Sequence, residues 1–304
     1  MTAETDTPTA SSAAPAARAG RRLPAAMVAW FQAAPLALVL GAFLVLPIIM
    51  IVIVSFWGAT EYSIYPAFQF DNYEFLFGSP VTYKVFFNTF KYALITWAAT
   101  LLIGFTVAYF LAFHVRSLTW QIALFLLCTI PFWTSNIIRM ISWIPFLGRN
   151  GIANSTLISW GVIDEPLDWL LFSDFSVILA FVHLYTLFMV VPIFNTMMRI
   201  DRSLIEASYD AGATGWQTLW HVIVPLTKPG IMIGTIFVIT LVMGDFITVR
   251  FMSGSQSANV GRLISNDIGL LQYPSAAATA VVLLVTVLLV IGILLRFVDI
   301  RKEL

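Results

Sequence analysis

Long apolar runs, most of them free of charged side chains over about 20 positions, divide this chain into regular segments. An α-helix needs about 20 mostly apolar residues to cross the roughly 30 Å hydrocarbon core of a bilayer. Backbone groups in lipid must bond within their own segment, and these runs lack the alternation of β-barrel strands. The pattern predicts an all-α polytopic membrane protein with six transmembrane helices, near residues 35–57, 92–113, 118–138, 175–198, 229–251 and 275–295. Asp245 and Arg250 interrupt the fifth run.

Composition leads to the same class of protein. Of the 304 residues, 60% are hydrophobic and 11% are charged, and the mean hydropathy is +0.90. Soluble domains carry about 25% charged residues, so an ordinary water-soluble fold is excluded.

The net charge is zero, but basic residues concentrate on one side of the predicted topology. Cytoplasmic loops carry an excess of Lys and Arg, so both termini are predicted to be cytoplasmic. Residues 1–29 are predicted to be a disordered cytoplasmic tail, because residues 2–22 are rich in Ala, Pro, Ser and Thr. Residues 30–304 then form one six-helix domain. The apolar run after Arg22 is too long for a secretion signal and lacks a small-residue cleavage site, which indicates a retained first helix.

Several chemistries find no support in the sequence. Cys128 is the single cysteine, which excludes disulfides within the chain, and the three histidines are scattered without metal-ligand spacing. No phosphate-binding loop and no G-x-S-x-G nucleophile elbow occur. We therefore expect no catalytic residues, no metal site and no enzyme. A transporter, a channel or a structural membrane component remains.

A polar segment, residues 203–225, separates the fourth and fifth predicted spans. Capping boxes of the S/T-x-x-E/Q type occur at residues 203–206 and 214–217, and each predicts the start of a helix. Gly212 lies between them and suits the left-handed end of the first helix. We therefore predict two short helices bent at Gly212, the second amphipathic and running toward Pro225.

This segment resembles the cytoplasmic signature of the permease subunits of binding-protein-dependent ABC importers. That signature is E-A-A, three residues, G, nine residues, then I-x-L-P. Its counterparts here are Glu206, Ala207, Ser208, Gly212 and a run that ends in Pro225. Ser208 replaces the second alanine, and two valines replace the usual isoleucine and leucine.

The resemblance implies a type I ABC importer permease (MetI-like) architecture in a bacterial inner membrane. In that family the first short helix is a coupling helix, seated in a groove of a separate ATPase subunit. The residues expected to couple this chain to the ATPase are Glu206, Ala207, Ser208, Asp210, Gly212 and Pro225. The chain itself is expected to bind no cofactor, since ATP and Mg belong to the ATPase.

Roughly residues 30–300 resemble one branch of this family, the spermidine/putrescine permeases, and specifically their first permease subunit. The matching motifs are R-x-x-x-W at 139–143, L-G-x-x-G-x-x-N at 147–154, and the segments 161–166 and 244–246. The implied partners are a second permease, an ATPase dimer, a periplasmic substrate-binding protein and the lipid bilayer, with no nucleic acid. The implied solute is a polyamine.

The candidate solute-path residues are Asp245, Arg139, Arg250, Trp133, Asn136 and Trp143. A carboxylate within a span is costly unless it faces a cavity or a partner, so Asp245 either contacts the solute or pairs with Arg139 or Arg250. The aromatic residues could stack on a cation or simply lie at the membrane interface. Many polyamine-type members have proline where this chain has Val249 followed by Arg250, so an amino acid, an opine or another zwitterionic or anionic solute remains open. An ion-coupled secondary carrier, a channel and a purely structural subunit are the alternatives from other classes.

Overall fold

The computed structural model describes the backbone of residues 25–60 and 63–296 and the side chains from Gln32 onward. The chain divides into two units, Met1–Met50 and Ile51–Leu304. In the first unit the backbone forms α1 (Ala25–Leu40), a π-helical turn (Gly41–Val45) and the start of α2 (Leu46–Val54). Of the predicted tail, residues 1–24 lie outside the described residues, and residues 25–29 belong to α1.

The second unit is helical apart from two short strands, β1 (Gly58–Ala59) and β2 (Ile64–Tyr65), which pair antiparallel. Its helices are α3 (Asp71–Gly78), α4 (Pro80–Tyr109), α5 (Leu118–Thr129), α6 (Asn136–Leu147), α7 (Ile152–Ser159), α8 (Asp174–Met197), α9 (Arg202–Asp210), α10 (Gly215–Thr218), α11 (Val224–Gly244), α12 (Ile247–Met252), α13 (Val260–Gly269) and α14 (Tyr273–Arg296). Turns of π-helix extend α4 (Phe110–His114) and join α10 to α11 (Leu219–Ile223), while 3₁₀ turns follow α5 (Ile130–Trp133) and precede α8 (Asp168–Leu170).

Within the described residues, five continuous helical stretches are long and apolar enough to cross a membrane: Gln32–Val54, Pro80–His114, Asp174–Met197, Gly215–Gly244 and Tyr273–Arg296. The pair Leu118–Trp133 and Asn136–Ser159 also qualifies, but its two halves are bent by 88°. Counted as one broken span, this pair completes the predicted set of six.

Two predicted spans contain a break that their prediction as single helices lacks. The third, residues 118–138, is interrupted at the 3₁₀ turn that contains Pro131, because a proline there removes a helical hydrogen bond. The fifth, residues 229–251, ends at Gly244, since Asp245 has extended backbone angles (φ −83°, ψ 112°). Apolar residues continue on both sides of each break, so hydropathy gives no signal at the first, and at the second only Asp245 and Arg250 interrupt the run.

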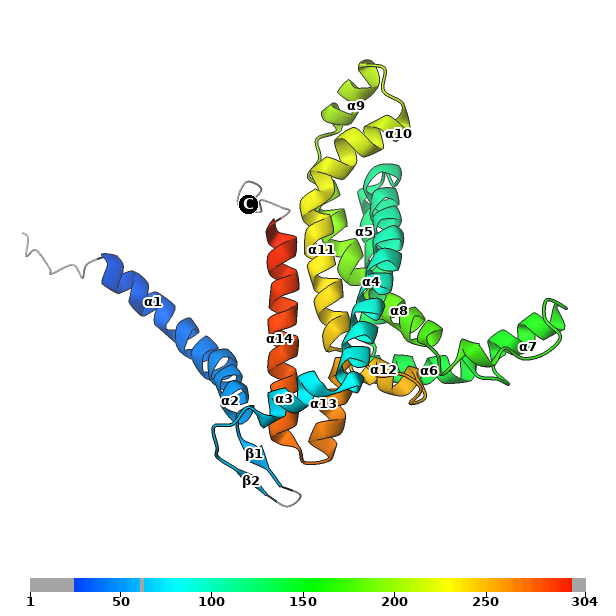
Figure 1. Ribbon diagram of the computed structural model, residues 1–304. Coiled ribbons are helices and arrows are strands. Elements are labelled where there is room, and N and C mark those ends of the chain that lie inside the picture. The colour runs from blue at the N-terminus through cyan, green and yellow to red at the C-terminus, as the bar shows by residue number, and fades with distance from the viewer. Residues whose placement is uncertain (1–24, 61–62, 297–304) are drawn as a thin grey trace, which may run out of the picture. The chain divides into compact units, whose positions relative to one another are not determined.

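The centre of the second unit is built by α4, α8 and α11, which pack against one another (Figure 1). Buried side chains from these helices include Tyr92, Phe181, Met189 and Val238. Gly230 of α11 allows the closest approach to α8, because a Cβ there would lie 2.5 Å from the carbonyl oxygen of Pro192. Small residues at helix contacts are typical of membrane proteins, where packing rather than water exclusion holds helices together.

Apolar side chains also cover outward faces of the predicted spans. On α14, Leu284, Leu288, Leu289 and Ile293 are exposed, whereas buried positions such as Ala276 and Ala278 lie near its first turns. This distribution suits hydrocarbon as the solvent around the helix.

The continuous helix Gly215–Gly244 has different elements at its two ends (Figure 1). The helices α9 and α10 lie at one end. At the opposite end α12 and α13 follow the break at Asp245.

Candidate functional site

The segment 203–225 begins differently from its prediction. Helix α9 is capped by Asp201, whose carboxylate accepts a hydrogen bond from the Ser203 amide at 2.9 Å. Hydrogen bonding with Ser203 lowers the pKa of Asp201 below its usual value. The predicted capping box of Ser203 and Glu206 is therefore wrong, because an aspartate two residues earlier reaches the free amides first.

Gly212 ends the first helix as predicted. Its φ is +84°, and a Cβ at this position would meet nothing within 4 Å. The Gly212 amide donates to the Tyr209 carbonyl at 2.8 Å, and the Ala213 amide donates to the Ser208 carbonyl at 3.1 Å. This pair of bonds is a Schellman motif, so the requirement for glycine is conformational rather than steric.

The second helix starts as predicted and continues further. Thr214 and Gln217 form the reciprocal capping box, with bonds of 3.3 Å and 2.8 Å. A short helix that runs toward Pro225 was expected. The helix instead continues past Pro225 to Gly244. Pro225 lies in the first turn of α11 directly after the wider π turn, where a missing backbone donor is tolerated.

The two helices of this module are tied together and exposed. The hydroxyls of Ser208 and Thr218 lie 2.9 Å apart and join α9 to the second helix. Glu206, Ala207 and Asp210 are exposed, and so are the large apolar side chains Leu204, Tyr209, Trp216 and Trp220. The elbow itself contains a hollow of about 300 Å³, lined by Ser208, Ala211, Gly212, Ala213, Gln217 and His221. Exposed apolar groups beside a hollow mark an interaction site.

Asp245 lies in the break between α11 and α12 rather than inside a helix. Its carboxylate accepts hydrogen bonds from the Tyr185 hydroxyl (2.7 Å), the Thr248 hydroxyl (2.7 Å) and the Thr248 amide (2.9 Å). The Asn259 side chain donates to the Asp245 carbonyl at 2.6 Å. The aspartate thus holds α8, α12 and the start of α13 around the break.

Neither of the anticipated ion pairs of Asp245, with Arg139 or with Arg250, is present. The ion pairs among the described residues are Lys91–Asp174 at 2.6 Å and Arg149–Asp168 at 3.4 Å. Asp245 is satisfied by neutral donors instead, which sequence reasoning could not see because Tyr185 is on another helix.

Arg139 is buried in the first turn of α6, just after the bend in the broken third span, with 8% of its surface exposed. One guanidinium nitrogen donates to Asn136 at 2.5 Å, and Nε has no hydrogen-bond partner among the described residues. Trp143 donates to His183 Nδ1 at 3.0 Å. Arg139, Trp143 and His183 line one cavity of about 390 Å³, together with apolar residues of α4, α5 and α8.

The remaining candidates lie elsewhere. Trp133 is 83% exposed and lines a separate hollow of about 260 Å³. Arg250 is exposed on α12 and lines a third cavity. Three of the six predicted path residues, Arg139, Asn136 and Trp143, are thus gathered on α6.

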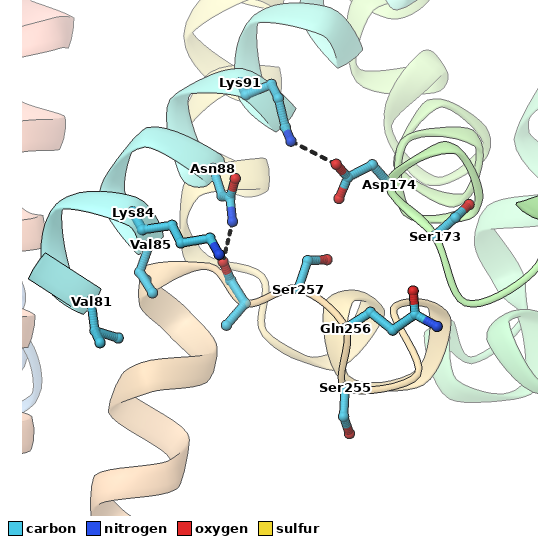
Figure 2. A pocket seen from close by; sticks show the side chains of 11 residues that line it. Val81, Lys84, Val85, Asn88, Lys91, Ser173, Asp174, Ser255, Gln256 and Ser257 are labelled. Carbon is cyan, nitrogen blue, oxygen red and sulfur yellow. Dashed lines mark hydrogen bonds and ion pairs between the residues drawn. The ribbon is translucent and has the colours of Figure 1, made fainter.

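A polar cluster that the sequence analysis missed lies where α4 meets the start of α8 (Figure 2). Lys91 and Asp174 form the ion pair there, and the hydroxyl of Tyr92 bonds to Asp174 and also to Ser257 at 2.7 Å. The partners are more than 80 residues apart in the chain, with separations of 83, 82 and 165. No local motif could have brought them together.

Within the described residues, no group of three or more His, Cys, Asp or Glu side chains could hold a metal ion. The second unit also contains an exposed two-helix module, a long helix and a helix break at Asp245.

Comparison with known proteins identifies the family. The family model described as "Binding-protein-dependent transport system inner membrane component" matches residues 101–303, a range that includes the module, Arg139 and Asp245. The chain belongs to this family. As an inner membrane component of such a system, it is a transport protein of the cytoplasmic membrane with several spanning helices.

Curated relatives of this inner membrane component are permeases. The spermidine/putrescine transport system permease protein PotB of Escherichia coli (strain K12) is 34% identical, over 83% of this chain and 90% of that protein. PotB of Haemophilus influenzae is 30% identical, over 84% and 88%. The inner membrane ABC transporter permease protein YdcU of Escherichia coli (strain K12) is 28% identical, over 77% of each.

Solved structures agree on the fold. A chain of the bacterial alginate ABC transporter, in complex with an alginate pentasaccharide-bound periplasmic protein, superposes with a TM-score of 0.71 at 16% identity. The match covers 88% of this chain and 92% of that one. The predicted ABC importer permease architecture is thereby confirmed for this family member.

Proposed function

We propose that this chain is the permease subunit of an ATP-driven importer that moves polyamines, spermidine or putrescine, across the inner membrane by alternating access. Its partners are a second permease, a separate ATPase dimer and a periplasmic substrate-binding protein. ATP and Mg bind in the ATPase, and both termini of this chain lie on the cytoplasmic side. The observation that carries the proposal is the exposed module 203–225, which turns at the left-handed Gly212 and continues into the helix that ends at Gly244.

The module suits an ATPase groove for physical reasons. Small side chains at Ala207 and Ser208 permit close approach, and Glu206 is exposed with no role in capping its own helix. The exposed rings of Trp216 and Trp220, 5.7 Å apart, extend the apolar surface beside the elbow. Such a surface gains stability when a partner covers it.

The polyamine assignment rests on the relatives named spermidine/putrescine permeases, which are similar over most of the chain. A second solute class, small zwitterionic or anionic compounds, is favoured by one observation. Arg139 is a buried guanidinium with no carboxylate partner among the described residues, and a carboxylate-bearing solute could neutralise it.

One reconstitution experiment tests both. The complex, in liposomes with its binding protein, is supplied with ATP and with radiolabelled spermidine, putrescine, glutamate or octopine. Uptake of a polyamine alone supports the proposal, whereas uptake of only the carboxylate-bearing solutes replaces the polyamine with the second class. Uptake that persists with a hydrolysis-deficient ATPase subunit overturns the importer mechanism in favour of a secondary carrier. Glu206→Ala is expected to lower ATP-driven uptake while the permease still inserts.

A further inference from the structure

Two adjoining polar hollows lie at the end of the second unit that carries α12 and α13. One, of about 500 Å³, lies between α4, the start of α8 and the loop after α12 (Figure 2). The other, of about 600 Å³, is lined by α12 and α13. Ser255 lines both, so the two hollows meet at this loop. We call the combined region the outer basic surface, and its defining residues are Lys84, Arg250, Ser255, Gln256 and Arg262.

The outer basic surface carries cations without counter-ions. Lys84 and Arg250 are exposed and are in no ion pair among the described residues. The Arg262 guanidinium bonds only to neutral hydroxyls, those of Ser253 and Ser255, each at 3.1 Å. The neighbouring Lys91 differs, because Asp174 neutralises it. Three positive charges without a carboxylate partner therefore face hollows whose remaining lining is hydroxyls, amides, a few apolar groups and the Lys91–Asp174 pair, whose charges cancel.

The loop between the hollows has an unusual backbone. Ser255 has a φ of +71°, a left-handed conformation that an L-residue adopts only where its surroundings impose it. The Ser253 hydroxyl donates to the Ser257 carbonyl at 3.0 Å, and Asn88 of α4 donates to the Ala258 carbonyl at 3.2 Å. These bonds hold the loop between the two hollows, on the α4 side through Asn88.

We propose that the outer basic surface receives carboxylate side chains from an acidic face of the periplasmic substrate-binding protein. The proposal rests on the proposed function, which puts the module on the cytoplasmic side and this surface on the outer side. A polyamine would be repelled by three uncompensated cations. A permanent contact with the second permease would be more apolar, since obligate interfaces resemble a protein core. A partner that docks and leaves in every cycle instead gains its rate of association from complementary charge.

The test measures docking of the solute-loaded binding protein on the assembled complex in nanodiscs, at 50 and 300 mM salt. Arg250→Gln and Arg262→Gln are compared singly and together, with Arg116→Gln as the matched control. Arg116 is also exposed, and it lies in the loop before α5 at the end that carries the module. We expect the double variant to lower the association rate constant at 50 mM salt about tenfold and to flatten its salt dependence, because exposed charges act over the Debye length. The Arg116 variant is expected to match the wild type.

An association rate constant for the double variant within twofold of the wild type overturns the inference. Unchanged docking together with loss of bound anionic phospholipid from the complex also overturns it. Basal ATPase activity and complex stoichiometry are recorded for each variant. If the double variant fails to assemble, the single variant Arg250→Gln tests the inference. Its association rate constant is then expected to fall, by less than that of the double variant. A wild-type complex that docks the binding protein but imports no polyamine removes the solute assignment and leaves this inference standing.

Discussion

Replacement of Gly212 separates backbone strain from every other role of the module. At φ +84° an L-residue costs roughly 1–2 kcal/mol, and the open space around the missing Cβ adds no steric term. In the alanine variant the left-handed turn after α9 is less populated, and the ATPase binds only that conformation. Gly212→Ala is therefore expected to weaken binding of the permease to the ATPase about 5- to 30-fold. Gly212→Asn should weaken it less, because asparagine tolerates the left-handed region.

The assay is the dissociation constant of the purified permease pair for its ATPase, followed by solute-stimulated ATP hydrolysis in nanodiscs. Gly215→Ala is the control, since its backbone is not left-handed and its Cβ would make an ordinary contact 3.6 Å from the Tyr209 hydroxyl. Equal losses with alanine and asparagine would refute the reasoning, because they would indicate a clash with the ATPase rather than strain. Unchanged binding in Gly212→Ala would refute it as well.

Three further predictions concern the membrane part. Gly230→Ala should lower the melting temperature of the complex, since its Cβ would lie 2.5 Å from the Pro192 carbonyl oxygen and overpacking costs about 1–3 kcal/mol; unchanged melting would contradict this. Asp245→Ala should destabilise the folded permease by about 1–3 kcal/mol, because the Thr248 amide and hydroxyl lose their acceptor. Asp245→Asn keeps an acceptor and should retain most solute uptake; a large loss of uptake in this variant would indicate that the charge itself contacts the solute. Burial raises the pKa of Asp267, so the folded state binds its proton more tightly and stability falls as pH rises through that range. Asp267→Asn should therefore raise the melting temperature at pH 7, with a gain that shrinks toward pH 4.

Local features of the module were predictable because they depend on neighbours in the chain. The reciprocal bonds of Thr214 and Gln217 join residues three apart, and the left-handed Gly212 follows from helix termination. The same local reasoning misassigned the first cap, because Asp201 and Ser203 both suit an N-cap and only the backbone geometry distinguishes them.

The predicted spans were recognisable from hydropathy, which reports whether a segment prefers lipid or water. It does not report where the axis of a helix changes direction. It could not show the 88° bend in the third span, where apolar residues lie on both sides. The surroundings of Asp245 were equally hidden, since the Tyr185 hydroxyl comes from a helix 60 residues away in the chain. The outer basic surface joins segments around residues 84, 250 and 262 and depends on tertiary packing alone.

The helix from Gly215 to Gly244 is continuous, so a rotation at one of its ends is transmitted to the other. Its 30 residues span about 45 Å at 1.5 Å per residue, and its π turn, Leu219–Ile223, lies within the module. A tilt of about 5° at one end therefore displaces the other by roughly 4 Å, comparable to the width of a small solute. The break at Asp245 lies at the far end of this helix, where hydrogen bonds from Tyr185 and Thr248 join it to α8 and α12, so a tilt of the helix would have to move these elements with it or lengthen those bonds.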